Sequence, residues 1–148
     1  MLIPDVNVLI NAHNRSSQLH ERSRDWWETA LNSDRPIGLP WVVILGFIRI
    51  TTNRRIIAHP LTVTDALDIV REWLEKPTVH IISPGDGHAE ILFNLLEAVG
   101  AAGNLTTDAH IAALAIEYHA EVATIDSDFD RLPGVRWFNP VAVKRRWR

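Results

Sequence analysis

Five short apolar segments, separated by helix-like stretches or turns, constrain the fold of this chain more than any other feature. The segments lie at residues 1–4, 37–39, 79–82, 121–125 and 135–138. Amphipathic stretches such as 18–32 and 64–75 lie between them. Strands that alternate with helices are typical of an α/β domain, because each crossover helix returns the chain to the same edge of a parallel sheet. We therefore expect a mainly parallel sheet of four or five strands flanked by helices.

The composition indicates one globular domain. The 148 residues suffice for a hydrophobic core, and with 47% hydrophobic and 22% charged residues the chain resembles soluble proteins. We expect the domain to span residues 1–140, followed by a basic tail at 141–148. No run is apolar enough to cross a membrane and the N-terminus lacks a basic leader, so we expect a cytoplasmic protein. Without cysteine, any bound metal must have oxygen or imidazole ligands.

Three carboxylates, those of Asp126, Asp128 and Asp130, follow the fourth apolar segment within five residues. Residues just past the C-terminal ends of parallel strands line the usual ligand crevice of α/β folds. Carboxylates gathered there repel one another unless a cation lies between them. The run therefore predicts either a divalent-metal site or a solvated turn, since Asp and Ser are also common turn residues. An EF-hand is excluded, because Arg131 and Trp137 occupy the positions of its required Gly and Glu.

Two further acids occupy comparable places. Asp5 ends the first apolar segment, and Asp108 lies in the first turn of a helix predicted over residues 108–119. Each also has a structural explanation, Asp5 as a helix N-cap and Asp108 as an acid favoured by the helix dipole. Their shared position at strand ends and helix starts favours one common site with Asp126.

Some neighbouring residues allow two interpretations. His110 points to a different side of its helix from Asp108, so the two are not a ligand pair. His88 and Glu90 are either ordinary first-turn residues of the helix that follows the third segment or additional members of the crevice. The stretch 41–50 is apolar almost all round, so we expect a mostly buried helix with Arg49 as an exception.

Three motifs together resemble those of PIN-domain ribonucleases of the VapC toxin type. They are Asp5-Val-Asn7-Val-Leu9, Thr107-Asp108-Ala-His-Ile-Ala-Ala-Leu-Ala115 and Ala123-Thr124-Ile-Asp126-Ser-Asp128-Phe129, the last followed by Leu132-Pro-Gly134. The resemblance implies a PIN-like three-layer fold over essentially the whole chain. It identifies Asp5, Asp108 and Asp126 as catalytic, metal-binding acids and Asp128 as an accessory metal ligand. It also implies an RNA substrate, a cognate antitoxin and a homodimer.

The sequence departs from this family at one place. The family commonly has a further Glu on the helix after the second strand, but no acid occurs here between Asp34 and Asp65. Gly46 lies in the corresponding region. The Phe-x-Arg run at Phe47 and Arg49 resembles a subgroup of such toxins.

These features predict a Mg²⁺-dependent endoribonuclease toxin that cleaves structured RNA, tRNA or rRNA, to block translation. Oxygen ligands suit Mg²⁺, for which Mn²⁺ may substitute, and Asn7 and Thr124 are candidates for orienting metal-bound water. An acidic pocket repels RNA and the net charge is −3, so we expect Arg49, Arg54 and Arg55 to attract it. The alternative is a catalytically impaired PIN-like module that binds RNA or protein, as the missing Glu suggests.

Overall fold

The computed structural model describes residues 1–100 and 103–143, so most of the predicted basic tail, residues 144–148, lies outside the described part. Five strands form one sheet in the order β3-β2-β1-β4-β5, and each neighbouring pair is parallel. The strands are β1 (Leu2–Pro4), β2 (Ile37–Pro40), β3 (Val79–Ile82), β4 (Glu121–Ala123) and β5 (Arg136–Phe138). The helices are α1 (Val6–His13), α2 (His20–Leu31), α3 (Trp41–Thr51), α4 (Val63–Glu75), α5 (His88–Val99) and α6 (Thr106–Glu117). Short 3₁₀ helices occupy Gly103–Leu105 and Ser127–Arg131.

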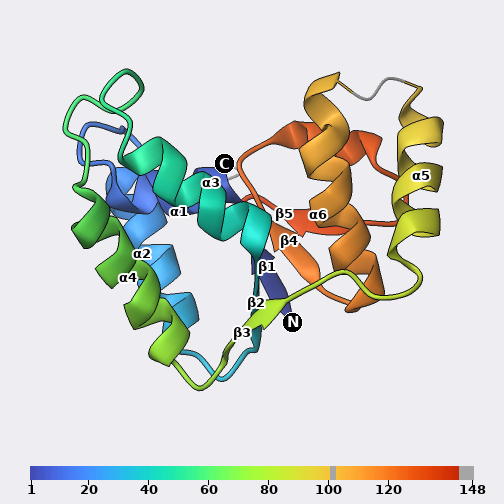
Figure 1. Cartoon of the computed structure of the whole chain (residues 1–148), viewed down its shortest axis with the longest axis horizontal. Coiled ribbons are helices and arrows are strands. Elements are labelled where there is room, and N and C mark those ends of the chain that lie inside the picture. The colour runs from blue at the N-terminus through green and yellow to red at the C-terminus, as the bar shows by residue number, and fades with distance from the viewer. Residues whose placement is uncertain (101–102, 144–148) are drawn as a thin grey trace, which may run out of the picture.

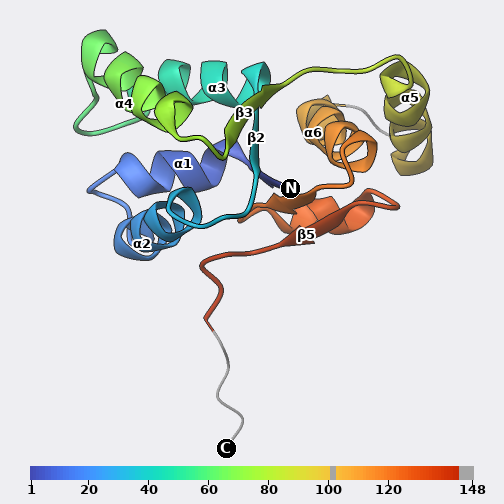
Figure 2. The ribbon, with the colours of Figure 1, turned by 90° about the horizontal axis from the view of Figure 1, so that it is seen from below.

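The helices form two layers around the sheet. Helices α1 to α4 connect β1, β2 and β3 and lie on one side, whereas α5 and α6 connect β3 to β4 and lie on the other (Figures 1 and 2). The chain first adds strands on one side of β1 and then returns to add β4 and β5 on its other side. The predicted α/β fold with a mainly parallel sheet of four or five strands is confirmed, and the sheet has five strands. No helix in the described residues is long and apolar enough to cross a membrane.

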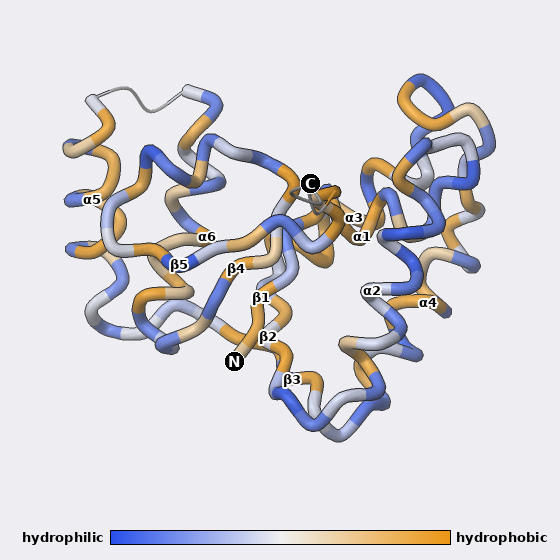
Figure 3. Tube along the Cα trace, turned by 180° about the vertical axis from the view of Figure 1, so that it is seen from behind, coloured by the Kyte–Doolittle hydropathy of each residue, from blue (hydrophilic) through white to orange (hydrophobic). Residues whose placement is uncertain are grey.

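The core forms where the strands meet the inner faces of the helices. Ile3, Leu39 and Val122 are completely buried in three adjacent strands, and Figure 3 shows the hydrophobic colour concentrated along the central strands. Strands that have helices on both faces of their sheet usually have continuously apolar sequences, and these strands have such sequences. On the side of α1 to α4, an aromatic cluster reinforces the core, with the ring centroids of Phe47 and Trp73 4.7 Å apart.

The expectation that the helix over residues 41–50 is mostly buried is wrong. Helix α3 packs through Val43, Ile44 and Phe47, whereas Trp41 and Leu45 expose 52% and 58% of their surface. The described neighbours of α3, mainly α1 and α4, cover one face and leave a strip of large apolar side chains in the open. Helix α3 has apolar residues on nearly every face, but its packing buries only one of these faces.

The described end of the chain remains packed against the domain. Val141 is buried, and the guanidinium of Arg22 on α2 donates a hydrogen bond of 3.1 Å to its carbonyl. The β5 strand and the residues after it thus reach across towards α2.

Candidate active site

Two of the predicted acids follow adjacent parallel strands. Asp5 comes directly after β1 and Asp126 lies three residues after the end of β4, and the register pairs Pro4 with Ala123. The backbone N–H of Asp5 donates to the carbonyl of Ala123 at 2.8 Å, which continues the strand pairing into the site. Because parallel strands end at the same edge, the two acids project from one place.

A hydrogen-bond network centred on Thr124 fixes the Asp5 carboxylate. The hydroxyl of Thr124 donates to Asp5 Oδ2 at 2.8 Å, and the backbone N–H of Val6 donates to Asp5 Oδ1 at 2.7 Å. Thr124 Oγ1 in turn accepts from Asn7 Nδ2 at 3.2 Å and from the backbone N–H of Asp126 at 3.0 Å. Asp5 is therefore both the N-cap of α1 and a positioned site residue.

The network gives Asn7 and Thr124 a positioning role. Asn7 also accepts a bond from the backbone N–H of Ile125, so it joins the start of α1 to the segment after β4. Both residues act on the Asp5 carboxylate and on the loop that carries Asp126. Their predicted role in orienting a metal-bound water stays a prediction.

The third acid, Asp108, comes from the opposite helical layer. It lies in the first turn of α6, and the 3₁₀ helix Gly103–Leu105 leads into that turn. Burial raises the pKa of Asp108, and the negative charges of Asp5, Asp126 and Asp128 raise it further, to about 7. Burial also raises the pKa of Asp5, against the hydrogen bonds from Thr124 and Val6. The fold therefore brings the four predicted acids close enough for their negative charges to interact.

The remaining acids of the C-terminal run differ in environment. Asp126 caps the 3₁₀ helix Ser127–Arg131 by accepting from the backbone N–H of Asp128 at 2.8 Å, and Asp128 itself is exposed. Asp130 accepts a bond of 2.9 Å from the indole N–H of Trp137. It is thus a structural residue of the turn.

The donor set fits a hard divalent cation. All four acids offer oxygen atoms, and their mutual repulsion at Asp108 is what a bound cation would relieve. Within residues 1–100 and 103–143 no three or more His, Cys, Asp or Glu side chains are arranged to hold a metal directly. Mg²⁺ retains several waters and needs few protein oxygens, so water-mediated contacts suit this arrangement.

One predicted RNA-binding residue borders the site. Arg49 lines a hollow of about 520 Å³ together with Val6 and Thr107, the chain neighbours of Asp5 and Asp108. Gly46 lies in the same hollow, where a Cβ atom would come within 3.1 Å of Val6. Helix α3 therefore approaches α1 closely in the region where the family carries its extra Glu.

The other two predicted RNA-binding residues, Arg54 and Arg55, are exposed beyond the end of α3. The ion pairs found within the described residues include neither of them, nor Arg49. Their guanidinium groups are therefore not neutralised by a described carboxylate of the same chain.

A histidine cluster on the far helical layer was missed at the sequence level. His88 Nδ1 lies 2.7 Å from Glu117 Oε2, and His88 Nε2 lies 2.9 Å from His110 Nδ1. His88 thus joins α5 to α6 instead of joining the acids. His88 and Glu117 are 29 residues apart, so only the packing of α5 on α6 reveals the contact.

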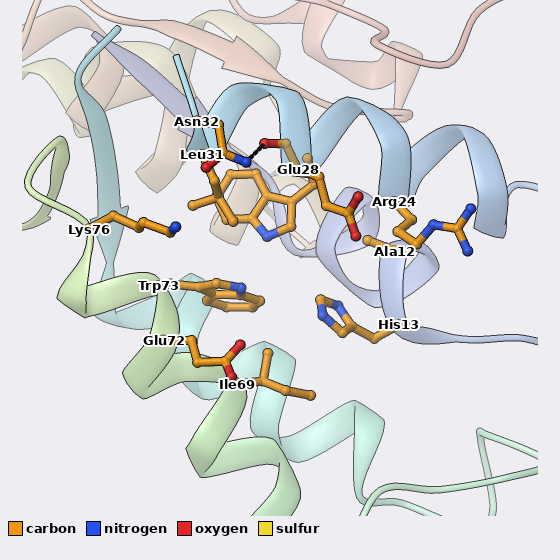
Figure 4. Close-up of a pocket in the computed structure, with 11 residues that line it drawn as sticks. Ala12, His13, Arg24, Glu28, Leu31, Asn32, Ile69, Glu72, Trp73 and Lys76 are labelled. Atoms are coloured by element: carbon orange, nitrogen blue, oxygen red, sulfur yellow. Dashed lines mark hydrogen bonds between the residues drawn. The ribbon is translucent and has the colours of Figure 1, made fainter. Parts of the chain in front are cut away.

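A second hollow, away from the acids, opens between α2 and α4. It has a volume of about 220 Å³, and Figure 4 shows the rings of His13 and Trp73 facing it. Glu28 and Glu72 lie at its rim. Burial lowers the pKa of His13, whose Nδ1 lies 3.0 Å from the carbonyl of Leu9. This ring belongs to the aromatic core.

Comparison with known proteins gives the family. The PIN domain family matches residues 2–135. The chain is 40% identical to ribonuclease VapC33 of Mycobacterium tuberculosis over 141 residues, which cover 95% of this chain and 99% of that one. It is 41% identical to ribonuclease VapC37 of the same organism over 143 residues, 97% of this chain and 99% of the other.

Solved structures show the same fold at low sequence identity. VapBC2 from Rickettsia felis, bound to a DNA fragment from its promoter, superimposes with a TM-score of 0.67 at 18% identity, covering 93% of this chain and 97% of the other. VapC20 of Mycobacterium tuberculosis, described as a sarcin–ricin loop cleaving toxin, gives 0.66 at 14% identity, covering 92% and 99%. With three acids at adjoining strand and helix ends and near-full-length relatives, the chain belongs to the PIN-domain family, among the VapC ribonucleases.

Proposed function

We propose that this chain is the toxin of a type II toxin–antitoxin pair, a cytoplasmic Mg²⁺-dependent endoribonuclease that cleaves structured RNA to block translation. The observation that carries the proposal is the convergence of Asp5, Asp108 and Asp126 from three separate elements, with the pKa of Asp108 raised to about 7. Such accumulated, uncompensated negative charge at one edge of a sheet is typical of a site that binds a cation.

The chain's own residues hold and orient this site. Thr124 and the N–H of Val6 fix both oxygens of Asp5, and Asp126 is aligned by its cap on the following 3₁₀ helix. When bound there, Mg²⁺ or Mn²⁺ would activate a water and neutralise charge on the phosphodiester. Asp128 at the exposed rim is the accessory ligand, and Asn7 and Thr124 would orient water.

The partners follow from the same family membership. The solved relatives include VapBC complexes, which supports an antitoxin partner for this chain. An RNA substrate, tRNA or rRNA, would be attracted by Arg49, Arg54 and Arg55, because the acids repel a polyanion. A homodimer is supported by the exposed apolar strip of α3 around Trp41 and Leu45.

Neutralising single acids tests the proposal. Asp5→Asn and Asp126→Asn are expected to lower RNA cleavage in Mg²⁺ at least about a hundredfold, because each removes a charge from the cation site. Asp130→Asn is the matched control, since Asn keeps an oxygen for Trp137, and it should cleave like the wild type. Wild-type cleavage by both site variants would exclude the metal-dependent mechanism.

A catalytically impaired PIN-like module is the second candidate. The absence of the family Glu in the region around Gly46 and the lack of a preformed direct-ligand cluster in the described residues favour it. Calorimetric titration with Mg²⁺ and Mn²⁺ separates the two functions. The enzyme should bind the ions and lose that binding in Asp126→Asn, whereas the impaired module should bind RNA but no metal.

A further inference from the structure

The acidic and basic side chains of this protein are unevenly distributed along the chain. No acid occurs between Asp34 and Asp65, and this stretch contains four arginines and His59. The ion pairs of the described residues include neither Arg15 nor the loop arginines Arg54 and Arg55. Residues 6–20 also contain no acid, so the loop after α1 and the loop after α3 both belong to stretches without carboxylates.

Two loops enclose a hollow on this surface. Residues 14–19 connect α1 to α2, residues 52–62 connect α3 to α4, and the hollow between them has a volume of about 610 Å³. Its lining contains no carboxylate and consists of His13, Arg15, Ser16, His59 and Leu61. Figure 1 shows both loops at the end of α1 that lies farthest from β1. The lining offers the guanidinium of Arg15 together with imidazole and hydroxyl hydrogen-bond donors, which suit an anion.

The loop between α3 and α4 is held in place from within. Ile57 is buried in the domain, and the backbone N–H of Leu61 donates to the carbonyl of Thr51 at 2.8 Å. The amides of Ile56 and Ile57 both donate to the carbonyl of Asn53 at 3.0 Å. The exposed side chain of His59 therefore projects from an anchored loop.

Helix α1 relates this hollow to the acids. Asp5 caps its start and His13 ends it, so eight residues at 1.5 Å rise place the two ends about 12 Å apart. A stacked nucleic-acid strand advances about 3.4 Å per nucleotide, so roughly three to four nucleotides span this distance. An RNA strand with its scissile phosphate at the acids can thus reach the hollow.

We propose that the hollow between the two loops binds a backbone phosphate of the RNA substrate, roughly three to four nucleotides from the scissile one, through Arg15 and His59. The inference rests on the proposed ribonuclease function and extends it from the cleavage site to a substrate anchor. The guanidinium of Arg15 and the ring of His59 supply the contacts, and the hydroxyl of Ser16 adds a neutral donor. A phosphate contact of this kind positions the strand without reading its sequence.

Binding without cleavage tests the anchor separately from catalysis. A fluorescein-labelled, unstructured RNA of about twelve nucleotides is titrated in EDTA and followed by anisotropy at several salt concentrations. The variant Arg15→Gln/His59→Gln should bind about tenfold more weakly, because hydrogen bonds to a charged group are lost. The slope of log K against log salt should become shallower by about 0.7 per phosphate contact removed.

Two controls make the result specific. Arg71→Gln removes an arginine that pairs with Asp68 on α4 and should bind RNA like the wild type. Arg15→Lys keeps the charge and should retain the wild-type salt slope. The proposal is overturned if the double variant matches the wild type, if the wild type does not bind this RNA, or if Arg15→Lys shows the shallower salt slope of the double variant. Failure of the proposed ribonuclease function would appear in a different experiment, as wild-type RNA cleavage by Asp126→Asn.

Discussion

At the scale of the residue, the site acids serve two purposes at once. Asp5 caps α1 and Asp126 caps a 3₁₀ helix, as single-residue reasoning predicts for an Asp before a helix. The same residues are brought to one edge with Asp108. The sequence could predict the site members from their equivalent positions and from the family motifs. It could not predict that Thr124 joins Asp5, Asn7 and Asp126, because those contacts exist only after β1 and β4 have paired.

Asp108 should make the metal-free protein less stable as pH rises. Its unfolded pKa is near 3.9 and its folded pKa is about 7, so between these values the folded state retains a proton that the unfolded state has lost. The free energy of unfolding therefore falls as pH rises from about 4 to about 7. Asp108→Asn should remove this dependence and stabilise the metal-free protein at pH 8 by about 1–2 kcal/mol, after allowing for solvent screening.

Urea unfolding in EDTA at pH 5 and pH 8 measures this effect. The comparison of wild type with Asp108→Asn isolates the contribution of one carboxyl from those of all others. Asp130→Asn should follow the wild type within about 0.5 kcal/mol at both pH values. An equal pH dependence in the wild type and Asp108→Asn would contradict the raised pKa.

At the scale of the element, α3 packs closely on α1 in the region where this chain departs from the family pattern. Gly46 allows α3 to approach Val6 so closely that a Cβ atom would lie 3.1 Å from Val6 Cγ2. A side chain at this place needs Val6 to move by a few tenths of an ångström. The absence of an acid was visible in the sequence, but the close approach was not, since it joins residues 40 positions apart in the chain.

Gly46→Ala should destabilise the protein, although alanine is the better helix former. Overpacking costs about 1–3 kcal/mol, and the gain in helix propensity is about 1 kcal/mol, so we expect a net loss of about 1 kcal/mol. In a Val6→Ala background the contact is absent, and Gly46→Ala should become neutral or stabilising. A double-mutant cycle by urea unfolding measures the coupling, and equal effects in both backgrounds would contradict it.

At the scale of the whole molecule, the fold was predictable and its surfaces were not. Alternating apolar segments and helices predict a parallel sheet, because few other topologies use that order. The same hydropathy pattern predicted burial for α3, yet its neighbours in the described structure cover only one face. Which apolar residues remain exposed depends on how many layers surround a helix, and local sequence does not carry that information.

The exposed strip of α3 leads to a prediction about assembly. If the protein dimerises through Trp41 and Leu45, then Leu45→Glu should place a charge in the interface and shift the protein to the monomer. Sedimentation velocity at micromolar concentration measures this. Val63→Glu is the control, since Val63 on α4 is similarly exposed, at 59%, and it should leave the dimer intact. A monomeric wild type, or a dimer that survives Leu45→Glu, would contradict this surface.

The central position of β1 also affects when the protein becomes active during its synthesis. Translation delivers β1 first, but its neighbour β4 begins 117 residues after β1 ends, at Glu121. Until β4 leaves the ribosome, Asp5 lacks the Thr124 hydroxyl and the nascent chain has no Asp126 beside it. Domains fold as units once their pairing strands are available. If the proposed ribonuclease function holds, the growing polypeptide therefore has no complete acidic site for most of its synthesis.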